Sequence, residues 1–200
     1  MSNPSQFDSC YYAIVSTPGG DCGLLWQGGL EAKPQLLRVY PACGNPKLLL
    51  KTLRNEYPTA QLFAGELPPW IQRAREFLAA YYAGDKSNST QAEPDWHWLK
   101  QFLFWRGQTV FSRRVLTATF QIKRGTTISY GDLARKINHP GAARAVGGAL
   151  ARNPWPVLIP CHRVIGSDGA MTGFSGYGKI AAKKRMLALE QRALFIKGAC

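Results

Sequence analysis

The chain has 200 residues, 46% of them hydrophobic, which is enough for one large domain or two small ones around a real core. Its formal net charge is +13. Such a charge favours a polyanionic partner, either nucleic acid or an acidic membrane surface. A membrane surface is the weaker of the two, because the chain lacks an apolar stretch of about 18 residues and no basic amphipathic helix stands out near a terminus.

The beginning of the chain lacks the basic start and apolar core of a signal peptide, so we expect an intracellular protein, cytoplasmic or, in a eukaryote, nuclear. Five cysteines form an odd set without regular spacing, which predicts free thiols rather than a disulfide framework. Cys10, Cys22 and Cys43 could join a zinc site with a histidine, but no Cys-x-x-Cys or His-x-x-x-His spacing supports one. We therefore expect no metal and no cofactor.

Residues 1–84 are expected to form a first half of the chain with a structural role. Residues 11–16 and 22–26 flank a Pro-Gly-Gly turn and predict a hairpin, to which residues 36–40 add a third strand. The apolar spacing of residues 69–82, with a proline near the start, predicts a helix. No polar cluster in this half suggests chemistry, so we expect it to serve as support.

A polar stretch at residues 85–95 is the expected linker to a second half, residues 96–200. There, residues 111–121 have an amphipathic helical pattern that Gly125 would end. Residues 129–137 predict another helix, because Ser129 can cap it and Asp132 stands three residues later.

A His-Pro-Gly turn follows, and residues 142–151 predict a second short helix. Two short helices joined by a tight turn outline a helix-turn-helix. The second helix consists almost entirely of small residues, and its Gly147-Gly148 pair lowers helix stability. Either another helix of the chain or a narrow DNA groove could require such a close approach. The lone Arg144 is either a solvated charge or a probe that enters the base stack.

Residues 160–164 read Pro-Cys-His-Arg-Val and follow an apolar run at 157–159 that prolines bound on both sides. The run predicts a short buried strand with fixed ends. A base beside Cys161 eases the loss of its proton, and a thiolate is a strong nucleophile. The pair is therefore a candidate reactive centre. The alternative is a core cysteine beside an incidental His162.

Several segments, in this order, resemble the O6-alkylguanine-DNA alkyltransferases. They are residues 129–134 (Ser-Tyr-Gly-Asp-Leu-Ala), 142–149 (Ala-Ala-Arg-Ala-Val-Gly-Gly-Ala), 153–154 (Asn-Pro), 159–165 (Ile-Pro-Cys-His-Arg-Val-Ile), Gly169 and 173–176 (Gly-Phe-Ser-Gly). The resemblance extends over about residues 108–190 and is loose over residues 1–100. It implies an α+β protein of two domains. The N-terminal domain would be a ribonuclease-H-like antiparallel sheet with a helix, and the C-terminal domain would be mainly helical with the helix-turn-helix.

The resemblance also implies direct DNA repair in a single turnover. An alkylated guanine is flipped out of the duplex, and its alkyl group passes to a cysteine of the protein; O4-alkylthymine is a second candidate substrate. Cys161 would be the nucleophile. His162 would take its proton and reach Glu190 through a water, so that Glu190 orients the imidazole. Tyr130 would stabilise the negative charge that develops on the leaving guanine.

Substrate-binding roles follow from the same resemblance. Asn153 would be a hinge before the active-site segment. The backbone of Val164 would accept from the guanine amino group, and that of Ser175 would donate to O6. Phe174, where the family often has Tyr, would bound the pocket, and Pro156 would limit the size of the alkyl group.

The implied partner is double-stranded DNA, contacted through the minor groove by a protein that acts as a monomer. Arg144 would fill the hole left by the flipped base, while Gly147 and Gly148 would let the helix enter the groove. Ala143 and Tyr130 would lie on the same surface.

Other functions remain open on the residues alone. A helix-turn-helix regulator, or a sensor that recognises an alkylated base without transfer, accounts for the charge and the helix pair but not for a Cys-His pair beside a glycine-rich loop. A cysteine hydrolase needs an acyl intermediate and an oxyanion hole. The order of motifs in this chain also does not match that of a hydrolase, and a hydrolase function would leave the basic charge unexplained.

Overall fold

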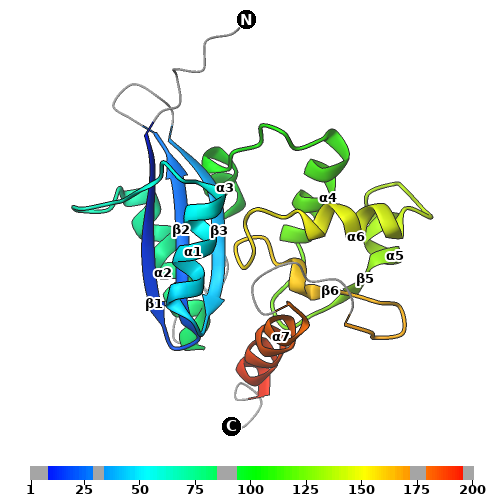
Figure 1. Ribbon diagram of the computed structural model, residues 1–200. Helices are drawn as coiled ribbons and strands as arrows, with labels where there is room; N and C mark the ends of the chain where they lie inside the picture. The colour runs from blue at the N-terminus through cyan, green and yellow to red at the C-terminus, as the bar shows by residue number, and fades with distance from the viewer. Residues whose placement is uncertain (1–8, 29–33, 85–93, 172–178, 196–200) are drawn as a thin grey trace, which may run out of the picture.

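The computed structural model describes residues 9–28, 34–84, 94–171 and 179–195. The first half forms a four-stranded sheet with helices, and the second half is mainly helical (Figure 1). The predicted α+β class is confirmed. Most of the expected linker, residues 85–95, lies outside the described residues.

Three strands of the sheet form an antiparallel meander: β1 (Cys10–Thr17), β2 (Gly20–Gln27) and β3 (Gln35–Cys43). They confirm the predicted hairpin and third strand. A short fourth strand, β4 (Gln61–Leu62), pairs in parallel with β1, so the sheet is not wholly antiparallel and has the order β3-β2-β1-β4. Strand β3 is therefore an edge strand.

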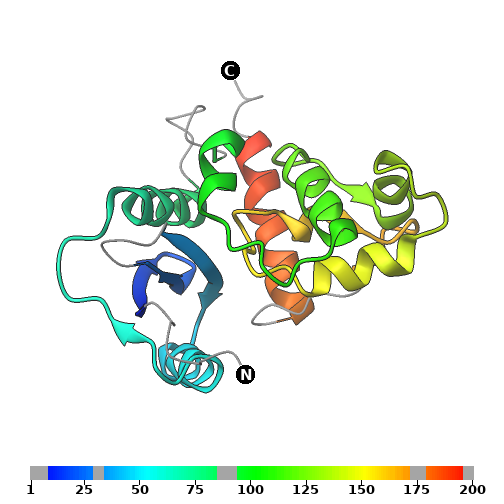
Figure 2. The same cartoon turned by 90° about the horizontal axis from the view of Figure 1, so that it is seen from above.

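Helices cover both faces of this sheet, as the view in Figure 2 shows. Helix α2 (Pro69–Ala83), which was predicted, packs Leu78 into the larger hydrophobic core. Helix α1 (Pro46–Glu56), which was not predicted, packs Leu49 and Leu53 against the other face. Because successive residues of a strand point to opposite faces, the strands are apolar on both sides. The sheet is thus a rigid support for α2.

The second half, where it is described, contains five helices. They are α3 (Trp96–Phe102), α4 (Val110–Phe120), α5 (Tyr130–Lys136), α6 (Ala143–Ala151) and α7 (Lys179–Phe195). Helices α4, α5 and α6 pack on one another and match the predicted helices within a residue or two. Ser129 caps α5 by accepting from the Asp132 N–H at 3.0 Å, as predicted. No helix in the described ranges is both long enough and apolar enough to cross a membrane.

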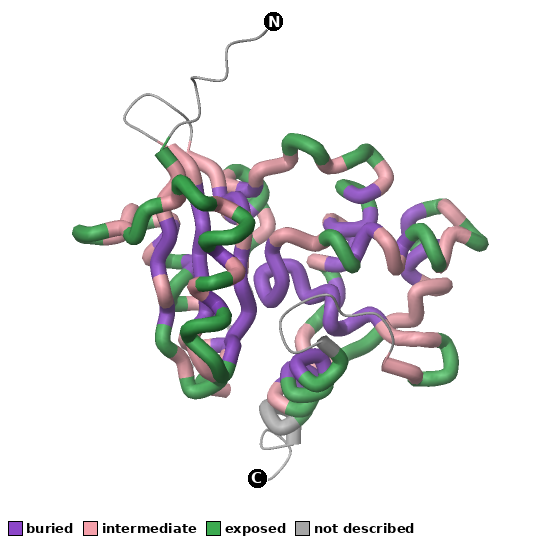
Figure 3. Tube along the Cα trace, in the orientation of Figure 1, coloured by how far each residue is buried: buried purple, intermediate pink, exposed green. Residues whose placement is uncertain are grey.

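Contacts along strand β3 join the two halves. The Val39 N–H donates to the Pro154 carbonyl at 2.8 Å, and the buried Trp155 indole donates to the Leu36 carbonyl at 2.9 Å. A single hydrophobic core runs from the sheet into the helices of the second half. These contacts hold residues 155–164, the buried stretch between the sheet and the C-terminal helices in Figure 3, against the sheet edge.

Candidate active site

A turn, not a strand, leads into Cys161. In residues 157–159 the Ile159 N–H donates to the Trp155 carbonyl at 2.8 Å, so the strand prediction is wrong. The prolines that bound the run lack the N–H groups that a strand ladder needs. Val157 has a φ of 74°, a left-handed conformation that costs a non-glycine residue about 1–2 kcal/mol. A single 3-10 turn, η1 (Cys161–Arg163), follows.

Asn153 connects the end of α6 to this turn. Its Nδ2 donates to the Ile159 carbonyl at 2.9 Å, and its Oδ1 accepts from the Trp155 N–H at 3.0 Å. The same side chain forms a hydrogen bond with Cys161. Asn153 therefore fixes the turn and contacts the thiol as well.

The Cys161 side chain is almost fully enclosed, with the residue only 7% exposed. Burial raises the pKa of its thiol, although the hydrogen bond from Asn153 and the charge of Lys183 act in the opposite direction. The thiol is therefore protonated at neutral pH. A neighbouring base must take the proton before or as the sulfur attacks.

His162 and Glu190 form a fully buried pair. Nε2 of His162 lies 2.7 Å from Oε1 of Glu190, and neither side chain is exposed. This distance leaves no room for a water between them, so the expectation of a water-mediated contact is wrong. Within the described part of the chain, Nδ1 of His162 has no hydrogen-bond partner.

The charges of this pair follow from its surroundings. Burial lowers the pKa of His162, although the hydrogen bond and the charge of Glu190 raise it. Burial alone would raise the pKa of Glu190, but His162 and the Arg163 guanidinium outweigh it and hold that pKa at about 2. At neutral pH a neutral imidazole therefore faces a carboxylate. A carboxylate only accepts, so Nε2 carries the imidazole proton and Nδ1 has the lone pair of a base.

Arg163 and Gly125 fix the Glu190 carboxylate. The Nε atom of Arg163 lies 3.2 and 3.1 Å from the two carboxylate oxygens, and the Gly125 N–H donates to Oε2 at 3.0 Å. Arg163 is only 3% exposed, so the cation and the anion compensate each other inside the protein. Sequence reasoning expected Gly125 only to end a helix and gave Arg163 no role beyond the motif.

The first half contributes Tyr81, from helix α2. Its hydroxyl lies 3.1 Å from Nε2 of His162 and 3.0 Å from Oε1 of Glu190. This half, expected only to support the site, therefore places a hydroxyl in contact with the His162–Glu190 pair. No local signal marks Tyr81, because its partners are 81 and 109 residues away in the chain.

Sequence reasoning also missed Lys183, which is fully buried on α7. Its Nζ donates to the Val164 carbonyl at 2.5 Å and lies 5.6 Å from the centre of the Tyr130 ring. The Val164 carbonyl thus has one donor already, and its second lone pair can accept another. Lys183 stands seven residues before Glu190, two helical turns, so both side chains are on one face of α7.

The small residues of α6 border an open surface. Arg144 is exposed and Ala143 half-buried. A Cβ added at Gly147 would come no closer than 3.8 Å to a neighbouring side chain, and one at Gly148 no closer than 3.7 Å. These are ordinary van der Waals distances, so packing against the described residues does not require glycine at either position. Close contact with another helix in the described part of the chain therefore does not explain the glycine pair.

The structure says less about the other expected residues. Phe174 and Ser175 lie outside the described residues. Pro156 is buried and forms an isolated bridge with Ile159. No disulfide joins the described cysteines, among them the three of the first half. Nowhere in the described ranges do three or more His, Cys, Asp or Glu side chains gather as a metal site.

The sequence and the fold are both similar to those of known proteins. A family model for the DNA-binding domain of 6-O-methylguanine DNA methyltransferases matches residues 110–192. A methylated-DNA–protein-cysteine methyltransferase of Mycolicibacterium paratuberculosis is 39% identical over 184 residues, which cover 90% of this chain and 92% of the relative.

Two crystal structures share the fold. The Mycobacterium tuberculosis O6-methylguanine methyltransferase superposes with a TM-score of 0.69 at 33% identity, covering 92% of this chain and 94% of that one. Mycobacterium tuberculosis OGT in complex with DNA gives a TM-score of 0.66 at 32% identity, with the same coverage of 92% and 94%.

Proposed function

Because the chain belongs to the methylated-DNA–protein-cysteine methyltransferase family, we propose that it repairs O6-alkylguanine in DNA through Cys161. The protein transfers the alkyl group directly to itself and leaves an intact guanine behind. A thioether is not hydrolysed under physiological conditions, so each molecule acts once.

In the proposed step the sulfur of Cys161 attacks the alkyl carbon. A sulfur–carbon bond forms, the bond between that carbon and guanine O6 breaks, and the electron pair stays on guanine. The thiol proton passes to the imidazole of His162, and a proton returned to the base restores neutral guanine. The Tyr130 hydroxyl, on the N3 side of guanine, stabilises the developing negative charge.

The observation that carries this proposal is the neutral His162 imidazole, held at 2.7 Å by Glu190 and adjacent in the chain to a buried, protonated thiol. A buried base whose Nδ1 has no hydrogen-bond partner among the described residues is what a thiol of raised pKa requires. A regulator or a sensor without transfer has no use for such a base, so those alternatives leave this feature unexplained.

Duplex DNA would be bound through its minor groove by helix α6 of a protein monomer. Extruding a base costs a few kcal/mol of unstacking, and Arg144, exposed on α6, would fill the space that the base leaves. Gly147 and Gly148 would let the helix backbone approach the groove closely. Ala143 and Tyr130 would complete this surface.

The extruded base would lie in a pocket next to Cys161. The Val164 carbonyl would accept from the guanine amino group and the Ser175 backbone would donate to O6, while Asn153 would act as the hinge of the active-site segment. Phe174 and Pro156 would bound the pocket and limit the alkyl group. O4-alkylthymine is a second candidate substrate.

The chain would be organised as two domains. Residues 1–84 would form a ribonuclease-H-like domain, residues 85–95 a linker, and residues 96–200 the alkyltransferase domain. The succession of a sheet with two helices and then a mainly helical half supports this division. We place the protein in the cytoplasm, or in the nucleus of a eukaryote, because its substrate is genomic DNA.

Intact-mass spectrometry after incubation with a methylated oligonucleotide tests the reaction and the site together. We expect the mass of one methyl group to be added, on the peptide that contains Cys161. The Cys161→Ala variant should show no gain while it still binds the modified duplex. A variant that still gains the methyl group would exclude Cys161 as the acceptor.

A further inference from the structure

Tyr81 carries a hydroxyl from the sheet half of the molecule into the His162–Glu190 pair. It lies near the end of α2, is only 2% exposed, and contacts Nε2 of His162 at 3.1 Å and Oε1 of Glu190 at 3.0 Å. Helix α2 is anchored on the sheet by fully buried side chains such as Leu78. The position of this hydroxyl is therefore set by the first half of the chain.

The protons shared among Tyr81, His162 and Glu190 can be placed in only one way. The Glu190 carboxylate is ionised at neutral pH and can only accept. If Nε2 of His162 were bare, two lone pairs would face each other across 2.7 Å, so Nε2 must carry the proton and donate it to Glu190. The single proton of the Tyr81 hydroxyl must then also point to Oε1. Nδ1 of His162 is left with a lone pair.

The surroundings keep the Tyr81 hydroxyl in this donor role. The Arg124 guanidinium lies 5.1 Å from the centre of the Tyr81 ring, and the next residue, Gly125, donates to the other oxygen of Glu190. Burial, and then the charge of Glu190, raise the pKa of Tyr81 well above its ordinary value. The hydroxyl is therefore protonated at any pH at which the protein works.

We propose that Tyr81 is a positioning residue for alkyl transfer, which fixes Glu190 and through it His162 so that Nδ1 stays free to take the thiol proton. This inference rests on the proposed function. Tyr81 acts through Glu190 and His162, without touching the substrate. The first half of the chain thereby becomes part of the reactive centre instead of only supporting it.

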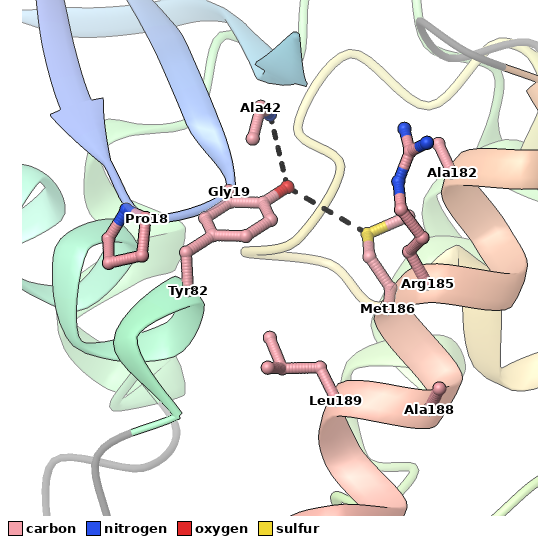
Figure 4. A pocket seen from close by; sticks show the side chains of 9 residues that line it. All are labelled: Pro18, Gly19, Ala42, Tyr82, Ala182, Arg185, Met186, Ala188 and Leu189. Carbon is pink, nitrogen blue, oxygen red and sulfur yellow. Dashed lines mark hydrogen bonds between the residues drawn. The ribbon is translucent and has the colours of Figure 1, made fainter. Parts of the chain in front are cut away.

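The neighbouring Tyr82 offers a matched control. Its hydroxyl accepts from the Ala42 N–H at 3.1 Å and donates to Met186 Sδ at 3.9 Å, so it too bridges the sheet and α7 (Figure 4). Tyr82 is not hydrogen-bonded to His162 or Glu190 in any contact of the described residues. Tyr81→Phe and Tyr82→Phe each remove one hydroxyl from the same junction, and only the first removes it from the reactive cluster.

We expect Tyr81→Phe to lower the single-turnover rate with free O6-benzylguanine about tenfold at neutral pH, as loss of one hydrogen bond to a charged group would do. Tyr82→Phe should react at the wild-type rate. Without the Tyr81 proton, Glu190 attracts the imidazolium more strongly, so the acid limb of the pH–rate profile should move to higher pH in Tyr81→Phe alone. The charged and ionisable groups that face this cluster from the elements around it are Cys161, Arg163, Lys183, Arg124 and Tyr82.

Nitrogen-15 NMR of the histidines provides a readout that does not depend on activity. Wild-type His162 should show a protonated Nε2 and a bare Nδ1, and the Nε2 proton should exchange faster with water in Tyr81→Phe. A wild-type rate and acid limb in Tyr81→Phe, or an equal loss in Tyr82→Phe, would overturn the inference while leaving the repair function intact. If the wild-type protein itself gains no alkyl group, the proposed function fails, and the NMR comparison still shows whether Tyr81 positions the His162 imidazole.

Discussion

Single residues set the pH range in which the sulfur can react. His162 accepts the thiol proton only when it is neutral, and burial lowers its pKa below the ordinary value of 6.5. We therefore expect the acid limb of the pH–rate profile, where the single-turnover rate falls, to lie below pH 6.5. Rates with free O6-benzylguanine, measured across the acid range, test this without interference from DNA binding. An acid limb above pH 6.5 would contradict the burial argument.

Residues of the site differ in how far the sequence could identify them. Cys161 and His162 are adjacent and chemically distinctive, and Glu190 was found through the family resemblance. Tyr81 could not be found, because tyrosines are frequent at helix ends that face a core and its partners are distant in the chain. Lys183 was hidden for a different reason: a lysine on a C-terminal helix usually points to solvent.

At the scale of one element, substitution of a glycine in α6 should affect the stability of the fold and the affinity for DNA in opposite directions. Gly148→Ala should raise the free energy of unfolding by about 0.5–1 kcal/mol, because alanine favours the helix and the new methyl group meets nothing closer than 3.7 Å. The same methyl group should weaken binding to duplex DNA if α6 enters a groove. Thermal melts and fluorescence anisotropy measure the two effects.

Reaction with free O6-benzylguanine is the internal control for that variant, since it requires no groove and should proceed at the wild-type rate. Unchanged affinity for duplex would show that the glycine pair does not serve DNA binding. Loss of reaction with the free base would instead indicate damage to the active site.

Most elements with local end signals were predictable, with helix α1 as an exception. Helix α5 has its capping serine, and the hairpin has its Pro-Gly-Gly turn. The strand expected at residues 157–159 failed because apolar composition alone does not distinguish a buried turn from a buried strand. Val157 has its left-handed φ between Trp155 and Ile159, which are both hydrogen-bonded to the Asn153 side chain. Helix α1 went unnoticed although Asn45 caps it.

For the molecule as a whole, the net charge of +13 should govern affinity for DNA. Lysines and arginines that contact phosphates release counterions on binding, so the logarithm of the binding constant should fall linearly with the logarithm of the salt concentration. Anisotropy titrations of duplex DNA at several salt concentrations give the slope. A flat response would mean that the basic surface does not contact the DNA backbone.

The way the two halves meet was beyond sequence reasoning. The bond from Trp155 to Leu36 spans 119 residues, and neither partner has a composition that identifies it. The family resemblance was strong only in the second half, so it gave no reason to expect that the sheet edge would hold the active-site turn or that α2 would reach the catalytic pair. Long-range contacts of this kind depend on packing, which a single sequence does not display.

Helix α7 holds two oppositely charged side chains at a fixed separation along its axis. Lys183 and Glu190 share its buried face, seven residues apart, with Met186 between them, so roughly 10 Å of helix axis separates the amine from the carboxylate. At that spacing they cannot neutralise each other. The Glu190 carboxylate instead contacts the His162 imidazole and the Arg163 guanidinium, and the charge of Lys183 acts on the Cys161 thiol, whose pKa it lowers. Adding or deleting one residue between them would rotate one charge by about 100° out of the site, so the length of this segment is as much a part of the chemistry as the identity of its ends.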